Sequence, residues 1–167
     1  MAITGQFGLF KFPLHPDSYG SLANLRPGEF LNMVSFDNRR SIAQITSIET
    51  TLNSNSTLVN FVGAETTSMP ASFKDAKRER PEKQVHRQAG ESNMTFIQLY
   101  EFGELIAVFR SDEDTDRGHA VLTASKDIKY NGKNYFIDFR QADAVYDKDR
   151  LDVVYWDIYL YPYDTRK

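Results

Sequence analysis

One basic cluster in the middle of the chain has the side chains needed to contact a polyanion. Its six lysine and arginine residues are Lys74, Lys77, Arg78, Arg80, Lys83 and Arg87. Three acidic residues interrupt them, so residues 74–87 carry a net charge of +3. Mixed charge of this kind is typical of a solvated loop. A flexible arm of this kind beside a β-barrel could also grip a nucleic-acid backbone, which leaves nucleic-acid binding as an alternative function.

A second group of charged residues has the spacing of a cation site. Asp112, Asp114 and Asp116 recur at every second position, as the oxygen ligands of a calcium loop do. The match fails at two places, because Gly118 comes one residue too late for the turn and Thr123 replaces the bidentate glutamate. The segment is therefore predicted to be a solvated acidic turn, and no metal site is expected.

No motif for covalent or cofactor chemistry is present in the sequence. The chain has no cysteine, and the three histidines, His15, His86 and His119, lack a second ligand at metal-binding spacing. It also lacks the G-x-S-x-G sequence of a serine nucleophile and the Gly-Lys-Ser/Thr sequence of a phosphate-binding loop. The 23 acidic residues include no pair that a local pattern marks as catalytic. We therefore expect neither an enzyme nor a bound cofactor.

The last predicted strand, Val153–Tyr163, has two different faces. Alternate residues place Val154, Trp156, Ile158 and Leu160 on one face, which we expect to lie in the core. The opposite face carries Tyr155, Asp157, Tyr159, Tyr161 and Tyr163. Four tyrosines are more than a solvated strand needs, because each has a large apolar ring and one polar tip. Either a second layer or the charged segment at residues 64–92 covers them, or they form an interface to a subunit or ligand, where tyrosine is enriched.

Length and composition limit the scaffold that carries these residues. The chain has 167 residues and a net charge of −3, so it lacks the global basic field of a dedicated DNA coat. Its 13% aromatic content is too high for a disordered chain, and its length fits one domain over residues 1–167. No export signal is recognisable, and no apolar run approaches the roughly 20 residues that span a bilayer. We expect cytoplasmic synthesis and no membrane insertion.

Most of the predicted elements are β-strands. Before the basic cluster they cover Phe30–Phe36, Ser41–Leu52 and Thr57–Val62, and after it Thr95–Tyr100 and Leu105–Arg110. The segment Ser41–Leu52 could also open a helix with a capping box, but its threonines and isoleucines favour a strand. We interpret residues 64–92 as a long, charged, solvated insertion between two ordered parts.

The clearest turn signal comes late in the chain. Asn131-Gly132 separates Lys126–Tyr130 from Lys133–Arg140, and this dipeptide favours the type I′ turn of a β-hairpin. A further strand is predicted to begin at Ala120–Thr123. Together these elements predict an all-β protein, an antiparallel sandwich or barrel with one long charged loop insertion.

These features favour a structural role over catalysis. The sequence suggests a non-enzymatic assembly subunit whose partners are other copies of itself or other subunits of a larger complex. A component of a phage virion or of a tail-like machine would have this profile of a small, β-rich chain without cysteine. The alternative is a nucleic-acid-binding barrel that uses residues 74–87, and a small hydrolase has the least support.

Overall fold

The computed structural model describes residues 2–14, 22–37, 39–66, 94–111, 115–124, 126–148 and 150–163. The strands among them are β1 (Ala2–Phe7), β2 (Phe10–Pro13), β3 (Phe30–Ser35), β4 (Arg40–Leu52), β5 (Ser56–Glu65), β6 (Met94–Glu101), β7 (Glu104–Arg110), β8 (Asp127–Tyr130), β9 (Lys133–Asp147) and β10 (Arg150–Pro162). A short 3-10 helix, η1 (Leu22–Asn24), and one α-helix, α2 (Thr115–Thr123), complete the described elements.

All ten strands join one sheet that stays open. Its order is β2-β1-β5-β4-β3-β9-β10-β6-β7, and β8 pairs with the first part of β9. The all-β prediction is confirmed. The sheet is mixed, however, because β1 pairs with β5, β3 with β9 and β6 with β10 in parallel, while its other pairings are antiparallel. Parallel neighbours cannot be joined by a tight turn, so these three pairings connect strands that are distant in the sequence.

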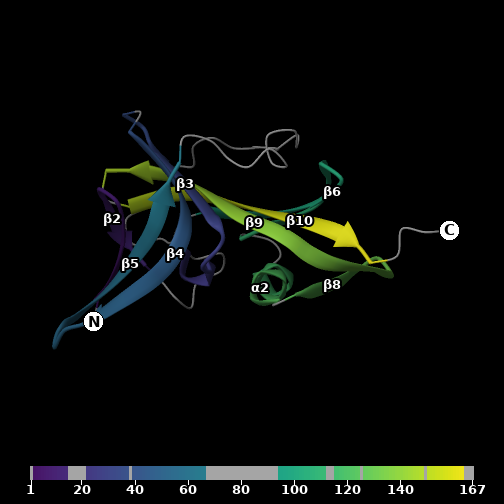
Figure 1. Ribbon diagram of the computed structural model, residues 1–167, viewed down its shortest axis with the longest axis horizontal. Helices are drawn as coiled ribbons and strands as arrows, with labels where there is room; N and C mark the ends of the chain where they lie inside the picture. The colour runs from purple at the N-terminus through teal and green to yellow at the C-terminus, as the bar shows by residue number, and fades with distance from the viewer. Residues whose placement is uncertain are drawn as a thin grey trace.

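The main hydrophobic core lies on one face of this curved sheet. Val154, Trp156, Ile158 and Leu160 of β10 all belong to it, as their alternation in the sequence predicts. Leu22 of η1 and Leu122 of α2 are buried in the same cluster. Figure 1 shows α2 and β8 on the same side of the β9–β10 ribbon. Residues of β1 and β2 reach this core too, because the sheet curls far enough for Phe10 to contact Tyr146.

The prediction that a strand begins at Ala120–Thr123 is wrong, because these residues form the last part of α2. Gly118, Val121 and Leu122 are its buried or half-buried positions, and this spacing of three and four residues is that of one helix face. Asp116 in the first turn also suits the positive end of a helix. The helix is only nine residues long, so its apolar positions are too few to show a clear period in the sequence.

The ambiguous segment Ser41–Leu52 is a strand, as its β-branched residues favour. Its partner β5 runs on to Glu65, beyond the predicted end at Val62. Gly63 permits this extension, because a Cβ atom there would lie 2.6 Å from the carbonyl oxygen of Gln44. The strands approach this closely beside a β-bulge at Thr46 in β4. The loop insertion predicted over residues 64–92 therefore begins within β5, and from residue 67 it lies outside the described residues.

Two tight turns share one backbone geometry. Asn131 and Gly132 have φ angles of 51° and 79°, which confirms the predicted hairpin between β8 and β9. Phe102 and Gly103 have φ angles of 51° and 80° and connect β6 to β7. A phenylalanine is unusual at a positive φ angle. This conformation places an aromatic side chain at the end of the sheet.

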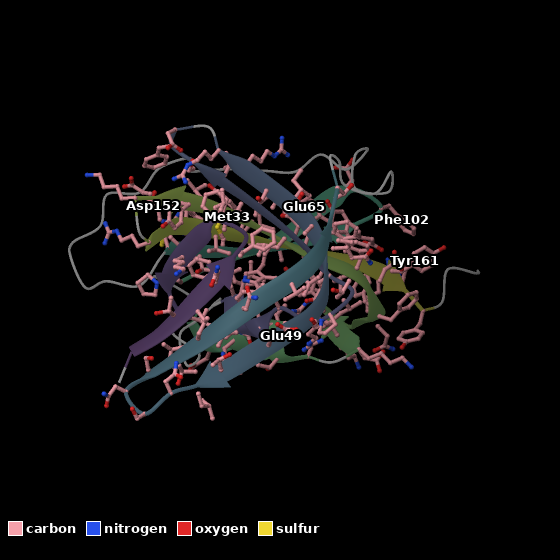
Figure 2. All side chains as sticks on the ribbon, turned by 60° about the vertical axis from the view of Figure 1, so that its left-hand side comes forward. Met33, Glu49, Glu65, Phe102, Asp152 and Tyr161 are labelled. Atoms are coloured by element: carbon pink, nitrogen blue, oxygen red, sulfur yellow. The ribbon has the colours of Figure 1, made fainter. Side chains whose placement is uncertain are left out.

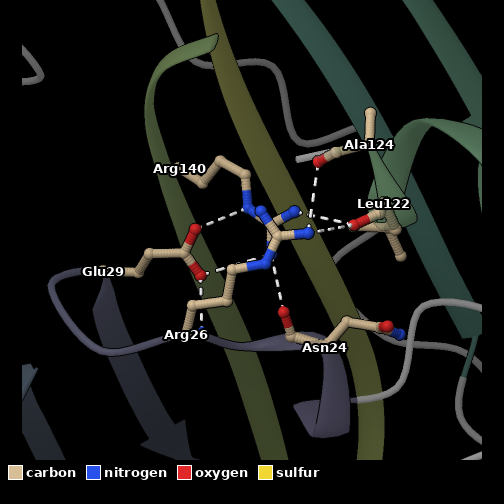
Figure 3. A network of polar contacts seen from close by, with 6 residues as sticks. All are labelled: Asn24, Arg26, Glu29, Leu122, Ala124 and Arg140. Carbon is tan, nitrogen blue, oxygen red and sulfur yellow. Dashed lines mark hydrogen bonds and ion pairs between the residues drawn. The ribbon is translucent and has the colours of Figure 1, made fainter. Parts of the chain in front are cut away.

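A buried ion pair fixes α2 and the segment after η1 to the sheet (Figure 3). Arg140 of β9 lies 2.7 Å from Glu29, measured from Nε to Oε2, and its side chain is almost fully buried. Its guanidinium group also donates to the carbonyl oxygens of Leu122 and Asn24, at 2.8 and 2.7 Å. Arg26 donates to the carbonyl oxygen of Ala124 at 3.1 Å. Two arginines thus bind carbonyls at the negative end of α2, where a positive charge is stabilising.

Burial disfavours the charged forms of both side chains in this ion pair, and their mutual attraction favours them. Burial raises the pKa of Glu29, against the opposing attraction of Arg140 and a hydrogen bond from the backbone of Arg26. Burial also lowers the pKa of Arg140. The guanidinium group lies 4.9 Å from the centre of the Trp156 ring, so the pair is packed directly on the core.

No helix in the described parts of the chain is long and apolar enough to cross a membrane.

Candidate interaction surface

The sheet face opposite the core carries the tyrosines of β10, and we call it the second face. Tyr155, Asp157, Tyr159 and Tyr161 follow one another on it along the strand. Tyr155 is only 2% exposed, Tyr159 is half-buried and Tyr161 is 43% exposed. Exposure therefore increases along β10, from the end where Asp152 lies to the end where Tyr161 lies (Figure 2).

Rings from β6 pair with these tyrosines and form a ladder across the two parallel strands. Phe96 stacks on Tyr155 with ring centres 5.1 Å apart, and Tyr100 stacks on Tyr159 at 5.0 Å. The ring planes in both pairs are nearly parallel, with an angle of 15° between them. The parallel register causes this, because it places Phe96 opposite Tyr155 and Tyr100 opposite Tyr159. Aromatic pairs of this kind contribute about 0.5–1.5 kcal/mol beyond their buried area.

A buried polar row separates the two stacked pairs. Gln141 of β9, Asp157 of β10 and Gln98 of β6 are register neighbours, and all three are fully buried. The amide of Gln141 donates to Asp157 at 2.8 Å, from Nε2 to Oδ2. Buried polar groups that bond across strands help to specify one register. The bond between Gln141 and Asp157 therefore helps to fix the register of β9 against β10.

The ladder ends in four aromatic side chains, which we call the end patch: Phe102, Phe136, Tyr161 and Tyr163. Phe102 and Tyr161 lie side by side at the end of β10, with ring centres 5.5 Å apart (Figure 2). Phe136 contacts both Tyr161 and Tyr163, at 5.5 and 5.3 Å. Phe102 is 66% exposed and Tyr163 is 51% exposed. Large aromatic surface thus reaches solvent at this end of the sheet.

Hydrogen bonds to acidic residues fix the surroundings of the end patch. The Tyr163 hydroxyl donates to Asp127 on β8, and this bond raises the pKa of Tyr163. On the core side of the same end, Glu101 forms an ion pair with Lys133 at 2.7 Å and accepts a hydrogen bond from Tyr135 at 3.2 Å. The bond to Glu101 raises the pKa of Lys133. Burial and the same carboxylate raise the pKa of Tyr135.

A shallow groove of about 510 Å³ adjoins the end patch. Its lining residues are Asp127, Ile128, Lys129, Asn134, Tyr135 and Tyr163. Tyr163 is the member that the groove shares with the patch. The groove therefore extends the aromatic surface with polar and charged side chains.

The structure places the other candidate residues apart from this surface or does not describe them. The whole basic cluster, Lys74 to Arg87, lies outside the described residues, as do His15, His86, Asp112 and Asp114. Asp116 and His119 are exposed on α2. Within the described ranges, no three histidine, cysteine or acidic side chains come together as a metal site.

Sequence reasoning missed Phe102 and Phe136 as members of the surface. Phe102 stands in the turn before β7, where a non-glycine residue at positive φ could have been noticed only with the structure. Phe136 and Tyr135 are neighbours on β9 and point to opposite faces of the sheet. A bulge at Asp138 interrupts the alternation, so the later residues of β9 do not show which face Phe136 occupies. Nothing local in the sequence shows that either residue meets Tyr161.

The fold and the surface define an all-β protein, built on one open mixed sheet, with an aromatic second face. The chain matches no protein-family model, no curated protein and no solved structure.

Proposed function

We propose that this protein is a non-enzymatic assembly subunit that associates with other copies of itself or with other subunits of a larger complex. The end patch is the contact surface in this proposal. A virion or tail-like machine is the kind of complex that the chain's profile suggests.

One observation carries the proposal: the ladder of stacked rings on the second face ends in solvent. Phe102, Tyr161 and Tyr163 keep about half or more of their surface exposed while they contact one another or Phe136. Aromatic side chains have few rotatable bonds and so lose little conformational entropy on binding, and tyrosine is enriched at interface centres. Hydrogen bonding of Tyr163 to Asp127 already orients one of these rings.

The test is to remove the patch and measure both folding and association. The double variant Tyr161→Ser/Tyr163→Ser should keep the melting temperature of the wild type, because both side chains are substantially exposed. Its association, measured by sedimentation across a concentration series, should weaken at least tenfold, since an interface tyrosine can contribute more than about 1 kcal/mol.

A matched control is the double variant Leu9→Ser/Leu52→Ser. These leucines are 87% and 76% exposed, so the control removes apolar side chains that are even more exposed than the two tyrosines and that lie away from the patch. The control should associate as the wild type does. Unchanged association of the tyrosine variant, or an equal loss in both variants, would contradict the proposal.

A further inference from the structure

The groove beside the end patch combines one aromatic ring with three hydrogen-bonding side chains. The ring belongs to Tyr163, and the three other side chains are those of Asp127, Lys129 and Asn134. Asp127 is the register partner of Phe136 in the end patch, so it lies on the second face. Lys129, two residues further along β8, and its register partner Asn134 lie on that face too.

Three contacts hold the Tyr163 ring in place, although the residue is 51% exposed. Its hydroxyl donates to Asp127, and its ring contacts Phe136 with centres 5.3 Å apart. Its backbone N–H donates to the carbonyl oxygen of Asn134 at 3.1 Å. A ring that is already fixed loses little freedom when a ligand binds. The exposed part of Tyr163 is therefore a preorganised platform for an apolar surface.

The polar side chains of the groove are available to a ligand. Lys129 and Asn134 are exposed, and neither side chain has a hydrogen bond or an ion pair with another residue in the described ranges. The ammonium group of Lys129 donates hydrogen bonds, the amide of Asn134 donates and accepts them, and the carboxylate of Asp127 accepts them. The groove thus offers both donors and acceptors beside the ring.

Charge and size limit the class of ligand. The opposite charges of Asp127 and Lys129 cancel, so the groove does not select a polyanion or a polycation. Its volume of about 510 Å³ lies within the range of about 300–1,000 Å³ that is usual for small-molecule sites. The ligand must present C–H surface to an aromatic ring and uncharged donors and acceptors to the polar side chains. A pyranose ring has both, because its C–H groups form an apolar face and its hydroxyls donate and accept.

We infer that this groove binds a neutral saccharide, with one pyranose ring stacked on Tyr163 and its hydroxyl groups bonded to Lys129, Asn134 and Asp127. The inference goes beyond the proposed function, because it concerns a small ligand and does not depend on association between subunits.

The test is a calorimetric titration of the wild-type chain with three neutral probes, cellotetraose, mannotetraose and galactotetraose, at millimolar concentration. At least one of them should bind saturably. A sulfated tetrasaccharide serves as the charged comparison and should bind no more tightly than the best neutral probe.

Variants then locate the binding. Lys129→Ala/Asn134→Ala should keep the melting temperature, because both side chains are exposed, and should lower the affinity about tenfold or more through the lost hydrogen bonds. Lys11→Ala/Asn55→Ala is the matched control, since it removes an exposed lysine and an exposed asparagine from the other end of the sheet. The control should bind the probe as the wild type does.

A second pair of variants tests the ring. Tyr163→Ala should abolish binding, because it removes the stacking platform. Tyr163→Phe keeps the platform and loses only the hydroxyl bond to Asp127, so it should retain most of the affinity. Equal losses in the two variants would show that the ring does not carry the binding and would overturn the inference.

The other outcomes separate this inference from the proposed function. Failure of the wild type to bind any neutral probe, tighter binding of the sulfated probe, or equal affinity of Lys129→Ala/Asn134→Ala and the wild type would overturn the saccharide site alone. Lys129→Ala/Asn134→Ala keeps all four rings of the end patch, so it should associate as the wild type does. Saccharide binding by a wild-type chain that stays monomeric at every concentration would support the site and count against self-association.

Discussion

Two regions of the same sheet carry different kinds of side chain on the second face. In the wing, formed by β2, β1, β5 and residues 46–52 of β4, that face carries mainly polar side chains. Its polar members are Thr4, Gln6, Lys11, Ser47, Glu49, Thr51 and Asn60. They are exposed or half-buried, and Glu49 is visible on the wing in Figure 2. In the centre, formed by β9, β10 and β6, the same face carries stacked aromatic rings.

The difference shows that one sheet combines two modes of packing. The wing alternates apolar and polar residues, as an antiparallel sheet with one solvated face does. The centre is buried on both faces, and its second face combines stacked aromatic rings with a buried polar row: Tyr155 and Trp156 are both almost fully buried although they point in opposite directions. The end patch lies where this second face reaches solvent. It is therefore the part of the molecule with the strongest physical reason to bind a partner.

The largest expected effect is on the core face of β10. Trp156 is completely buried and contacts Arg140, so Trp156→Ala should lower the free energy of unfolding by about 3–5 kcal/mol. Leu52→Ala in the wing should change it by less than about 0.5 kcal/mol, because Leu52 is exposed. Urea denaturation of both variants measures the difference. Equal losses in the free energy of unfolding would mean that Trp156 does not lie in the core.

A somewhat smaller effect is expected on the second face, and it tests the comparison itself. Tyr155→Ala removes a buried ring that stacks on Phe96, so it should cost about 2–4 kcal/mol. Thr51→Ala is the matched change on the second face of the wing and should cost less than about 0.5 kcal/mol. If thermal and urea denaturation gave similar values for the two variants, the second face would be solvated throughout and the contrast would fail.

The smallest effect concerns Glu29, at the junction of the two regions. Burial raises its pKa, so the folded state holds the proton more tightly than the unfolded state does. Its contribution to stability is then complete below the unfolded value of 4.5 and is lost as the pH rises through the raised pKa. Relative to Glu29→Gln, the wild type should lose stability over this interval. A relative gain in a pH series of urea denaturations would show that attraction to Arg140 outweighs burial.

The sequence predicts local features of this molecule better than distant pairings. The alternation along β10 places Trp156 in the core, and Asn131-Gly132 identifies a hairpin, because both signals depend on neighbouring residues. The parallel pairing of β6 with β10 is different, since about fifty residues separate the two strands and no local pattern encodes their register. The stacking of Phe96 on Tyr155 depends on this register.

For the same reason, only part of the candidate surface could be predicted from the sequence. Tyr161 and Tyr163 belong to the alternation of the last strand, so the sequence identifies them. Phe102 and Phe136 join them through a turn and a bulge that bring other strands to the same end. The network around Arg140 was also beyond prediction, because it connects residues more than a hundred positions apart.

The most direct measurement of the central claim is oxidative footprinting of the wild-type protein at low and high concentration. Hydroxyl radicals modify exposed aromatic and leucine side chains, so mass spectrometry reports the exposure of each peptide. Association through the end patch predicts that Phe102, Tyr161 and Tyr163 become protected at high concentration, while Leu9 and Leu52 stay equally reactive. Protection of the two leucines, with the three aromatic residues unchanged in an associated sample, would contradict the claim.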